Sequence, residues 1–264
     1  MKMFHSSLYE RPRYVTDLAE CHFYHTMEIP GYGLVSSQWD LRNGIREYTG
    51  GIAFAGKRVL EIGTASGFVC FFMEREGADV VAYDLSDNFD WDVVPIAGLE
   101  YSKLLADRRS AIRKLNNGYW LAHRAFGSNA KVVYGTVYDI PSAIGPVDVA
   151  TLCAVLHHVR DPFRALWNAS RLTRETILVT ETLSPYPQAV PVSVPHGIPV
   201  VQFIPNTERH DAWWYLTPAT VKRFLSVLGF DKAEISFHQQ ESSEGTQSMF
   251  SVVAHRTAGA PLRD

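Results

Sequence analysis

Acidic residues and glycines recur in the first half of the chain at spacings that suit ligand binding. Glu61, Gly63 and Gly67 accompany a short apolar run, Val59 to Ile62, and a second apolar run ends in Asp84. Glycines let a chain turn tightly and let a ligand approach the backbone, and an acidic side chain at the next strand tip can bind two ribose hydroxyls. The pattern therefore predicts a strand–turn–helix–strand unit that binds a nucleoside.

The spacing within this turn excludes two common nucleotide sites. Its order is acidic-x-Gly-x-x-x-Gly, and Ala65 stands where a dinucleotide-binding turn has its second glycine. No Gly-Lys-Ser or Gly-Lys-Thr follows, so the turn is not a triphosphate-binding loop. What remains is a turn that holds a ligand without a pyrophosphate.

The rest of the chain alternates between buried strands and helical patterns. Runs without polar alternation are typical of parallel strands that are covered on both faces, and the last two runs suit an antiparallel edge. We therefore expect an α/β, Rossmann-like fold with a seven-stranded, mostly parallel sheet and an antiparallel end strand. The later predicted strands are 131–134, 148–153, 176–183, 232–238 and 248–255.

Two segments stand outside this alternation. Residues 1–50 are predicted to be an N-terminal extension that packs on the active site, with residues 51–264 as the main domain. Residues 184–216 carry prolines too densely for a helix or a central strand, and their aromatic content favours an ordered lid insertion. Side chains expected to contact a substrate from these two segments are Tyr24, His25, His196, His210, Trp213 and Trp214.

Composition narrows the range of partners. The chain has 264 residues, a formal net charge of −3 and 46% hydrophobic residues, which argue against a nucleic-acid partner and for a real core. No apolar run reaches the length of a membrane span, and the start lacks an apolar signal core. Three cysteines without metal-ligand spacing indicate a reducing compartment. We expect a cytoplasmic protein without membrane contact; a homo-oligomer is compatible with the sequence.

The glycine turn resembles the first motif of class I S-adenosylmethionine (SAM)-dependent methyltransferases. Longer segments resemble a bacterial family of tRNA wobble-uridine (5-methoxyuridine or carboxymethoxyuridine) methyltransferase-like proteins. These segments begin at Phe23 (Phe-Tyr-His-Thr-Met-Glu-Ile-Pro), Gln38 (Gln-Trp-Asp-Leu-Arg), Gly56 (Gly-Lys-Arg-Val-Leu-Glu-Ile-Gly) and Val155 (Val-Leu-His-His-Val-Arg-Asp-Pro). The resemblance covers residues 22–230.

The resemblance implies SAM as the cofactor and assigns residues to it. Glu61, Gly63 and Gly67 would shape the site of the amino-acid end, and Asp84 would bind the ribose. Thr136 stands where the family has an acidic residue, so Thr136 or the backbone of Val137 would read the adenine. The whole predicted cofactor set is Trp39, Glu61, Gly63, Thr64, Gly67, Asp84, Leu85, Thr136, Val137 and Cys153.

Two adjacent histidines follow a predicted buried strand at the edge where ligands bind in such sheets. In an extended segment after a strand, successive side chains point to opposite sides. His157 and His158 should therefore differ in role. The tRNA enzymes carry Leu-Tyr-His-Arg where this chain has Leu156-His-His-Val, which implies plain SAM here. By that resemblance His157 faces the transferring methyl as general base or substrate orienter, and His158 packs inward.

Several functions remain open at this stage. An O-methyltransferase for a small-molecule hydroxyl, on a sugar or a secondary metabolite, fits the aromatic lid and the acidic charge. The alternatives are a tRNA wobble-uridine methyltransferase and a SAM-binding protein without catalysis. His22, His25 and Glu28 could share a helical face, but without a dense carboxylate cluster we expect no metal site.

Overall fold

The computed structural model describes residues 8–90, 92–183, 195–204 and 211–257. A central sheet organises them, with strand order β3-β11-β12-β8-β7-β4-β5-β6. Five of its strands are parallel neighbours: β4 (Arg58–Ile62), β5 (Asp79–Asp84), β6 (Lys131–Tyr134), β7 (Val147–Cys153) and β8 (Thr173–Thr182). The strand order reverses beside β4, and ligands bind at the carboxyl ends of strands at such a point.

The other end of the sheet is antiparallel, as predicted. Strand β12 (Gly245–His255) pairs with β8, and β11 (Lys232–Ser242) pairs with β12. These two strands complete the seven that the sequence predicts. An eighth, the two-residue β3 (Trp39–Asp40), is added by the N-terminal extension through pairing with the end of β11.

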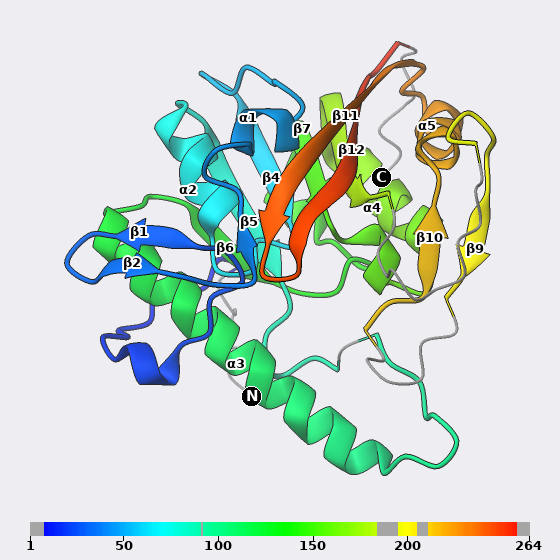
Figure 1. The fold of residues 1–264 in the computed structure, drawn as a ribbon. Helices are drawn as coiled ribbons and strands as arrows, with labels where there is room; N and C mark the ends of the chain where they lie inside the picture. Colours follow the sequence, from blue (N-terminus) through cyan, green and yellow to red (C-terminus); the bar gives the residue numbers. More distant parts are fainter. Residues whose placement is uncertain (1–7, 91, 184–194, 205–210, 258–264) are drawn as a thin grey trace, which may run out of the picture.

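Helices cover both faces of the sheet (Figure 1). One face packs against α1 (Ile45–Tyr48), α2 (Phe68–Arg75) and α3 (Tyr101–Phe126). The other packs against α4 (Pro162–Leu172) and α5 (Pro218–Val227). Short 3-10 turns lie at 18–20, 142–144 and 156–158. Each face therefore has its own apolar core, and the central strands are buried on both sides as their sequences predict.

Local signals explain where the two helices of the second face begin. Asp161 caps α4 by accepting a hydrogen bond from the backbone N–H of Arg164 at 2.9 Å, and Pro162 occupies the first turn. Thr217 caps α5 in the same way, with Pro218 next. Gly229 follows the end of α5 with a φ of +89°, a conformation that favours glycine. The first residues of both helices are thereby fixed next to the carboxyl edge of the sheet.

Two hairpins stand apart from the central sheet (Figure 1). The extension forms β1 (Met27–Ile29) and β2 (Gly33–Val35), and the predicted lid contributes β9 (Val201–Phe203) and β10 (Trp214–Leu216). The β9–β10 hairpin lies on the same side of the molecule as α5. Across the described ranges, no helix combines the length and the apolar character needed to cross a membrane.

Candidate cofactor and substrate site

The turn between β4 and α2 requires its two glycines. Gly63 and Gly67 have φ values of +83° and +89°. A Cβ at Gly63 would lie 2.6 Å from a methyl of Val155, and one at Gly67 would lie 2.5 Å from the ring of Phe71. Both positions therefore exclude a side chain, because neighbouring side chains fill the space and the left-handed backbone favours glycine.

Asp84 holds this turn from the end of β5. Its two carboxylate oxygens accept hydrogen bonds from the backbone N–H groups of Ala65 and Leu85, each at 2.7 Å. Burial raises the pKa of Asp84 to about 6, and the two hydrogen bonds offset part of that rise. An ionised carboxylate has about four acceptor sites, so each oxygen keeps capacity for a ribose hydroxyl.

Glu61 lies beneath the turn. Its carboxyl group is buried and accepts a hydrogen bond of 2.6 Å from the hydroxyl of Thr64, which is buried as well. Burial raises the pKa of Glu61 to about 8, although the Thr64 hydrogen bond acts in the opposite direction. The buried carboxyl group and the Thr64 hydroxyl thus join the end of β4 to the glycine turn.

The remaining residues predicted for the cofactor lie at the same edge of the sheet. Thr136 and Val137 follow β6 and are half-buried. Their carbonyls accept hydrogen bonds from the hydroxyl of Tyr83 at 2.8 Å and from the side-chain amide of Asn168 at 3.1 Å. Cys153 ends β7, and burial raises the pKa of its thiol. The loop after β6 is thus fixed from two sides, with its polar backbone next to Asp84.

His157 forms a buried pair with a carboxylate that the sequence analysis missed. Its Nδ1 atom lies 2.5 Å from Oε2 of Glu181, and these two residues are only 8% and 2% exposed. The other oxygen of Glu181 accepts a hydrogen bond of 2.7 Å from the backbone N–H of Leu156. A carboxylate on Nδ1 places the ring proton there and leaves Nε2 as the basic nitrogen. This is the arrangement that a general base requires.

The predicted division between the two histidines is wrong for His158. Its side chain is half-exposed rather than inward, and its Nδ1 atom bonds the carbonyl of Asp211. The two rings do not point apart: their centroids lie 3.8 Å apart, with the ring planes tilted by 42°. The reason is local: residues 156–158 form a 3-10 turn rather than a strand-like exit, so successive side chains turn by about 120°.

The described part of the predicted lid is bound to these histidines. The backbone N–H of Trp213 donates to the carbonyl of His157 at 2.8 Å, and its indole N–H donates to the carbonyl of Asp92 at 2.9 Å. The indole of Trp214 donates to the carbonyl of Arg160 at 3.0 Å. The carboxylate of Asp92 in turn accepts from Arg160 and from the hydroxyl of Tyr138. Loops from β5, β6 and β7 therefore converge on the lid.

The N-terminal extension reaches the same edge from the other side. The backbone N–H of Tyr24 donates to the hydroxyl oxygen of Ser66, inside the glycine turn, at 3.0 Å. His25 is buried against Phe68, the first residue of α2, and pairs through its backbone with Trp39. Tyr24, His25 and Trp39 are therefore brought to the turn.

Of the two remaining predicted substrate residues, His196 is described by the structure and His210 is not. His196 is exposed and packs on Phe237, which is two strands away from Glu181 in the sheet. His210 lies outside the described residues. In the described ranges, no three histidine, cysteine, aspartate or glutamate side chains gather in a way that could hold a metal ion.

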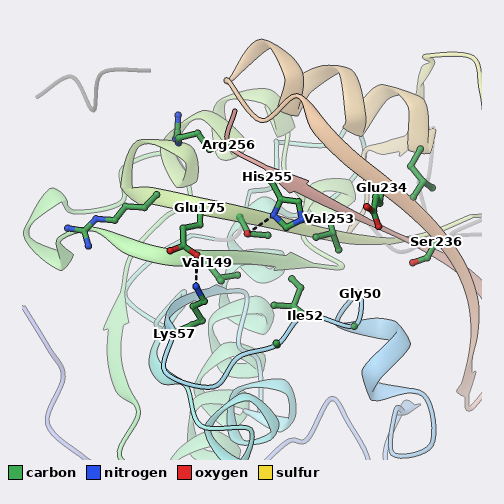
Figure 2. A pocket seen from close by; sticks show the side chains of 15 residues that line it. Gly50, Ile52, Lys57, Val149, Glu175, Glu234, Ser236, Val253, His255 and Arg256 are labelled. Carbon is green, nitrogen blue, oxygen red and sulfur yellow. Dashed lines mark hydrogen bonds and ion pairs between the residues drawn. The ribbon is translucent and has the colours of Figure 1, made fainter. Parts of the chain in front are cut away.

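A pocket of about 670 Å³ opens at the opposite, amino edge of the sheet (Figure 2). Its walls come from β7, β8, β11 and β12 and from the segment before β4. Two of its polar contacts are internal: Lys57 lies 2.6 Å from Glu175, and a ring nitrogen of His255 lies 3.0 Å from the hydroxyl of Thr176. The pocket shares no residue with the glycine turn or the His157–Glu181 pair, so it does not belong to the candidate site.

A family model described as a methyltransferase domain matches residues 40–232. The chain belongs to this methyltransferase family. The matched range includes the glycine turn, Asp84, the His157–Glu181 pair and the β9–β10 hairpin. It begins at residue 40, so Tyr24, His25 and Trp39 lie in the extension that precedes it.

Two known proteins are similar to this methyltransferase, one in sequence and one in fold. A ubiquinone biosynthesis O-methyltransferase of Cupriavidus pinatubonensis is 27% identical over 187 residues, 70% of this chain and 65% of that protein. The chain thus spans about two thirds of the length of the curated relative. The N-terminal domain of EvdMO1, solved with SAH and D-fucose, superposes with a TM-score of 0.56 at 18% identity, covering 89% of this chain and 91% of that domain.

A second solved structure has the same fold. Magnesium protoporphyrin IX methyltransferase from Synechocystis PCC 6803, with bound SAH, has a TM-score of 0.52 and 12% identity, and 82% of each chain is covered. At these identities the likeness concerns the fold, which agrees with the Rossmann-like methyltransferase architecture predicted from the sequence.

Glu181 and Asp92 are the polar residues of this methyltransferase site that sequence reasoning missed. Glu181 does carry a signal: it is a carboxylate near the end of an otherwise apolar or β-branched run, Ile177 to Thr182. A buried charge needs a partner, and the adjacent strand ends next to two histidines. Asp92 lies in an irregular loop after β5, where periodicity gives no guidance to its partners.

Proposed function

We propose that the protein is a SAM-dependent methyltransferase that transfers a methyl group to a hydroxyl oxygen of a small molecule. The observation that carries the proposal is the buried His157–Glu181 pair at the carboxyl edge that also holds the glycine turn. Family membership supports methyl transfer, and the O-methyltransferase relative supports an oxygen acceptor.

The residues present fit the cofactor. Gly63 and Gly67 allow the tight turn that leads into α2, and Asp84 keeps acceptor sites for a ribose. The half-buried loop at Thr136 and Val137 would lie along the adenine. When bound, SAM supplies an electrophilic methyl group on a sulfonium. The turn, Asp84 and the β6 loop would hold it in place.

His157 would manage the proton of the acceptor. Nε2 would take the proton of the acceptor hydroxyl, so that the oxygen could receive the methyl group that SAM would supply. Glu181 holds the ring in the tautomer that leaves Nε2 basic and stabilises the imidazolium that results. Positioning of the acceptor by the lid supplies much of the remaining acceleration.

A tRNA substrate is the second candidate, because of the sequence resemblance. The feature in its favour is α3, whose exposed side chains include Lys103, Arg109, Arg113 and Lys114. Arg109 is paired with Asp90, however, and the net charge of −3 gives no excess for a phosphate backbone. The third candidate, a SAM-binding protein without catalysis, does not require the buried His157–Glu181 pair.

The deciding experiment measures methyl transfer from radiolabelled SAM to a panel of phenols, catechols and sugars, with bulk unmodified tRNA in parallel. We expect label on a hydroxylated small molecule and none on tRNA, and loss of that transfer in His157→Ala. Labelled tRNA would favour the second candidate. SAM binding with no transfer to any acceptor class, equally in wild type and His157→Ala, would favour the non-catalytic alternative.

A further inference from the structure

Two buried polar atoms in the N-terminal extension have no hydrogen-bond partner in the described structure. They are Nδ1 of His25, whose residue is 6% exposed, and the indole Nε1 of Trp39. Nearly all buried polar side-chain atoms in proteins are paired, because an unpaired one has lost its hydration without compensation. Two such atoms in one segment point to a polar group that is bound there when the protein works.

The two atoms belong to neighbouring residues in space. His25 and Trp39 form a β-bridge, and the backbone N–H of Trp39 donates to the carbonyl of Tyr24 at 3.2 Å. The N–H of Thr26 donates to the carbonyl of Trp39. Residues paired in this way project their side chains to the same face of the ribbon. A single ligand group can therefore reach both side chains.

This ribbon is fixed to the start of α2. The Tyr24 backbone N–H is bonded to Ser66, and the ring of His25 lies 5.8 Å from that of Phe68. Phe68 directly follows Gly67, where the helix begins. The first backbone N–H groups of a helix have no partners within it and favour a negative charge. The unpaired side chains thus adjoin a helix start that suits a carboxylate.

We propose that His25 and Trp39 form the subsite for the α-amino-acid end of the cofactor, so that the extension is part of the cofactor site. The inference rests on the proposed function; it gives Trp39, already in the predicted cofactor set, a specific partner and adds His25 to that set. His25 is thereby moved from the substrate set, where the sequence analysis placed it, to the cofactor set.

The chemistry of the two side chains fits a zwitterion. An indole N–H can only donate, so Trp39 needs an acceptor such as a carboxylate oxygen. Burial lowers the pKa of His25 to about 3, so its ring is neutral and Nδ1 either donates or accepts according to tautomer. A carboxylate beside an ammonium group offers a partner for either tautomer, whereas a hydrocarbon or a plain hydroxyl does not satisfy both residues.

The test compares two ligands that differ only at this end. S-adenosylhomocysteine carries the amino-acid group, and 5′-methylthioadenosine has the same adenosine and thioether without it. Trp39→Phe, which keeps a ring and removes the N–H, should weaken calorimetric binding of S-adenosylhomocysteine about tenfold or more, the scale of a hydrogen bond to a charged group. Binding of methylthioadenosine should change less than about twofold, within ordinary surface-substitution effects. His25→Phe should behave in the same direction.

Two control variants distinguish a wrong assignment of Trp39 from a protein that does not bind the cofactor at all. Trp167→Phe, at an exposed position on α4, should affect neither ligand, and Asp84→Asn should weaken both. Equal losses for the two ligands in Trp39→Phe, or no loss for either, would overturn the inference while leaving SAM binding intact. If wild type bound neither ligand, the proposed function itself would fail.

A measurement on the wild-type protein covers the case in which a variant does not fold. In a ¹⁵N-labelled sample, the assigned indole N–H resonance of Trp39 should shift on addition of S-adenosylhomocysteine and stay in place on addition of methylthioadenosine. An indole resonance that responds identically to the two ligands would contradict a role at the amino-acid end.

Discussion

The Nδ1 atom of His157 and a carboxylate oxygen of Glu181 lie 2.5 Å apart, in residues that are almost fully buried. The second oxygen of Glu181 is bonded to the backbone that leads into the histidine, at Leu156. The carboxylate is therefore fixed independently of the ring that it orients. This relationship fixes the tautomer of a histidine in a short loop and suits it to the proposed role of general base.

His157→Ala should lower turnover of the acceptor by between about 100-fold and about 10,000-fold, the usual contribution of a general base. Calorimetric binding of S-adenosylhomocysteine should stay within about twofold of wild type, because the predicted cofactor contacts are elsewhere. His255→Ala is the matched control, since that histidine bonds Thr176 at the opposite edge. Equal turnover in His157→Ala and wild type would remove His157 from the chemistry.

Glu181→Gln keeps the shape of the side chain but removes its charge. We expect a lower maximal rate and a pH–rate profile whose acid-side limb, the rise in rate as the base loses its proton, moves to lower pH, since a neutral amide no longer stabilises the imidazolium. A role confined to packing would lower the melting temperature without moving the profile. An unshifted profile in a folded Glu181→Gln would therefore contradict the positioning role.

Binding of the cofactor should depend on pH through Asp84. Burial raises the pKa of this group to about 6 in the free protein, and ribose hydroxyls donate to the ionised form. Protonation therefore competes with binding, and affinity should fall as pH drops below about 6, by at most about tenfold per pH unit. Calorimetry of S-adenosylhomocysteine between pH 5 and 8 checks this.

Asp84→Asn is the control for that dependence. The variant should bind about tenfold to about 100-fold more weakly at pH 7.5, the scale of hydrogen bonds to a charged acceptor, and its affinity should be nearly flat over the same pH range. A wild-type affinity that rises toward acid pH would show that Asp84 is not the ribose acceptor.

Glu61 predicts a dependence of stability on pH. Its pKa is raised to about 8 in the folded state by burial, against an ordinary value of about 4.3 in the unfolded chain. The folded state holds the extra proton between these values, so the contribution to stability is complete below the unfolded value and is lost as pH rises through about 8. The wild-type melting temperature should fall from pH 6 to pH 9, and Glu61→Gln should reduce that fall. A parallel fall in both proteins would assign the effect to other groups.

Trp213→Phe tests the lid. The substitution keeps an aromatic ring but removes the indole hydrogen bond to the carbonyl of Asp92, so the lid should dock less well over the histidines. We expect kcat/KM for the acceptor to fall about threefold to about tenfold, the cost of one neutral hydrogen bond, with cofactor affinity unchanged. Loss of cofactor affinity instead would mean that this segment contacts the cofactor.

Most of the fold follows from local patterns in the sequence. Apolar runs such as Val59 to Ile62 mark strands that are buried on both faces, and glycines mark turns whose φ is positive, as at Gly63 and Gly67. The caps at Asp161 and Thr217 end up where the capping pattern predicts. These features depend on residues that are close in sequence, so a sequence reading captures them.

The site depends on pairs that are distant in sequence. Glu181 is 24 residues away from His157, and Trp213 is 121 residues away from the carbonyl of Asp92 that its indole bonds. Contacts between residues this far apart leave no periodic pattern in the sequence. The prediction for His158 is wrong for a local reason. It assumes that the chain stays extended after β7, whereas residues 156–158 form a 3-10 turn. The added strand at Trp39 likewise needs the far end of β11 as its partner.

We propose that cofactor and acceptor meet at the carboxyl edge of the sheet, between Asp84 and His157. A crystal structure of the protein with S-adenosylhomocysteine would show this arrangement. We expect electron density for the ribose on the carboxylate of Asp84, with the sulfur on the side that faces His157 Nε2. Density for the ligand in the pocket lined by Lys57 and His255, or a sulfur turned away from His157, would contradict it.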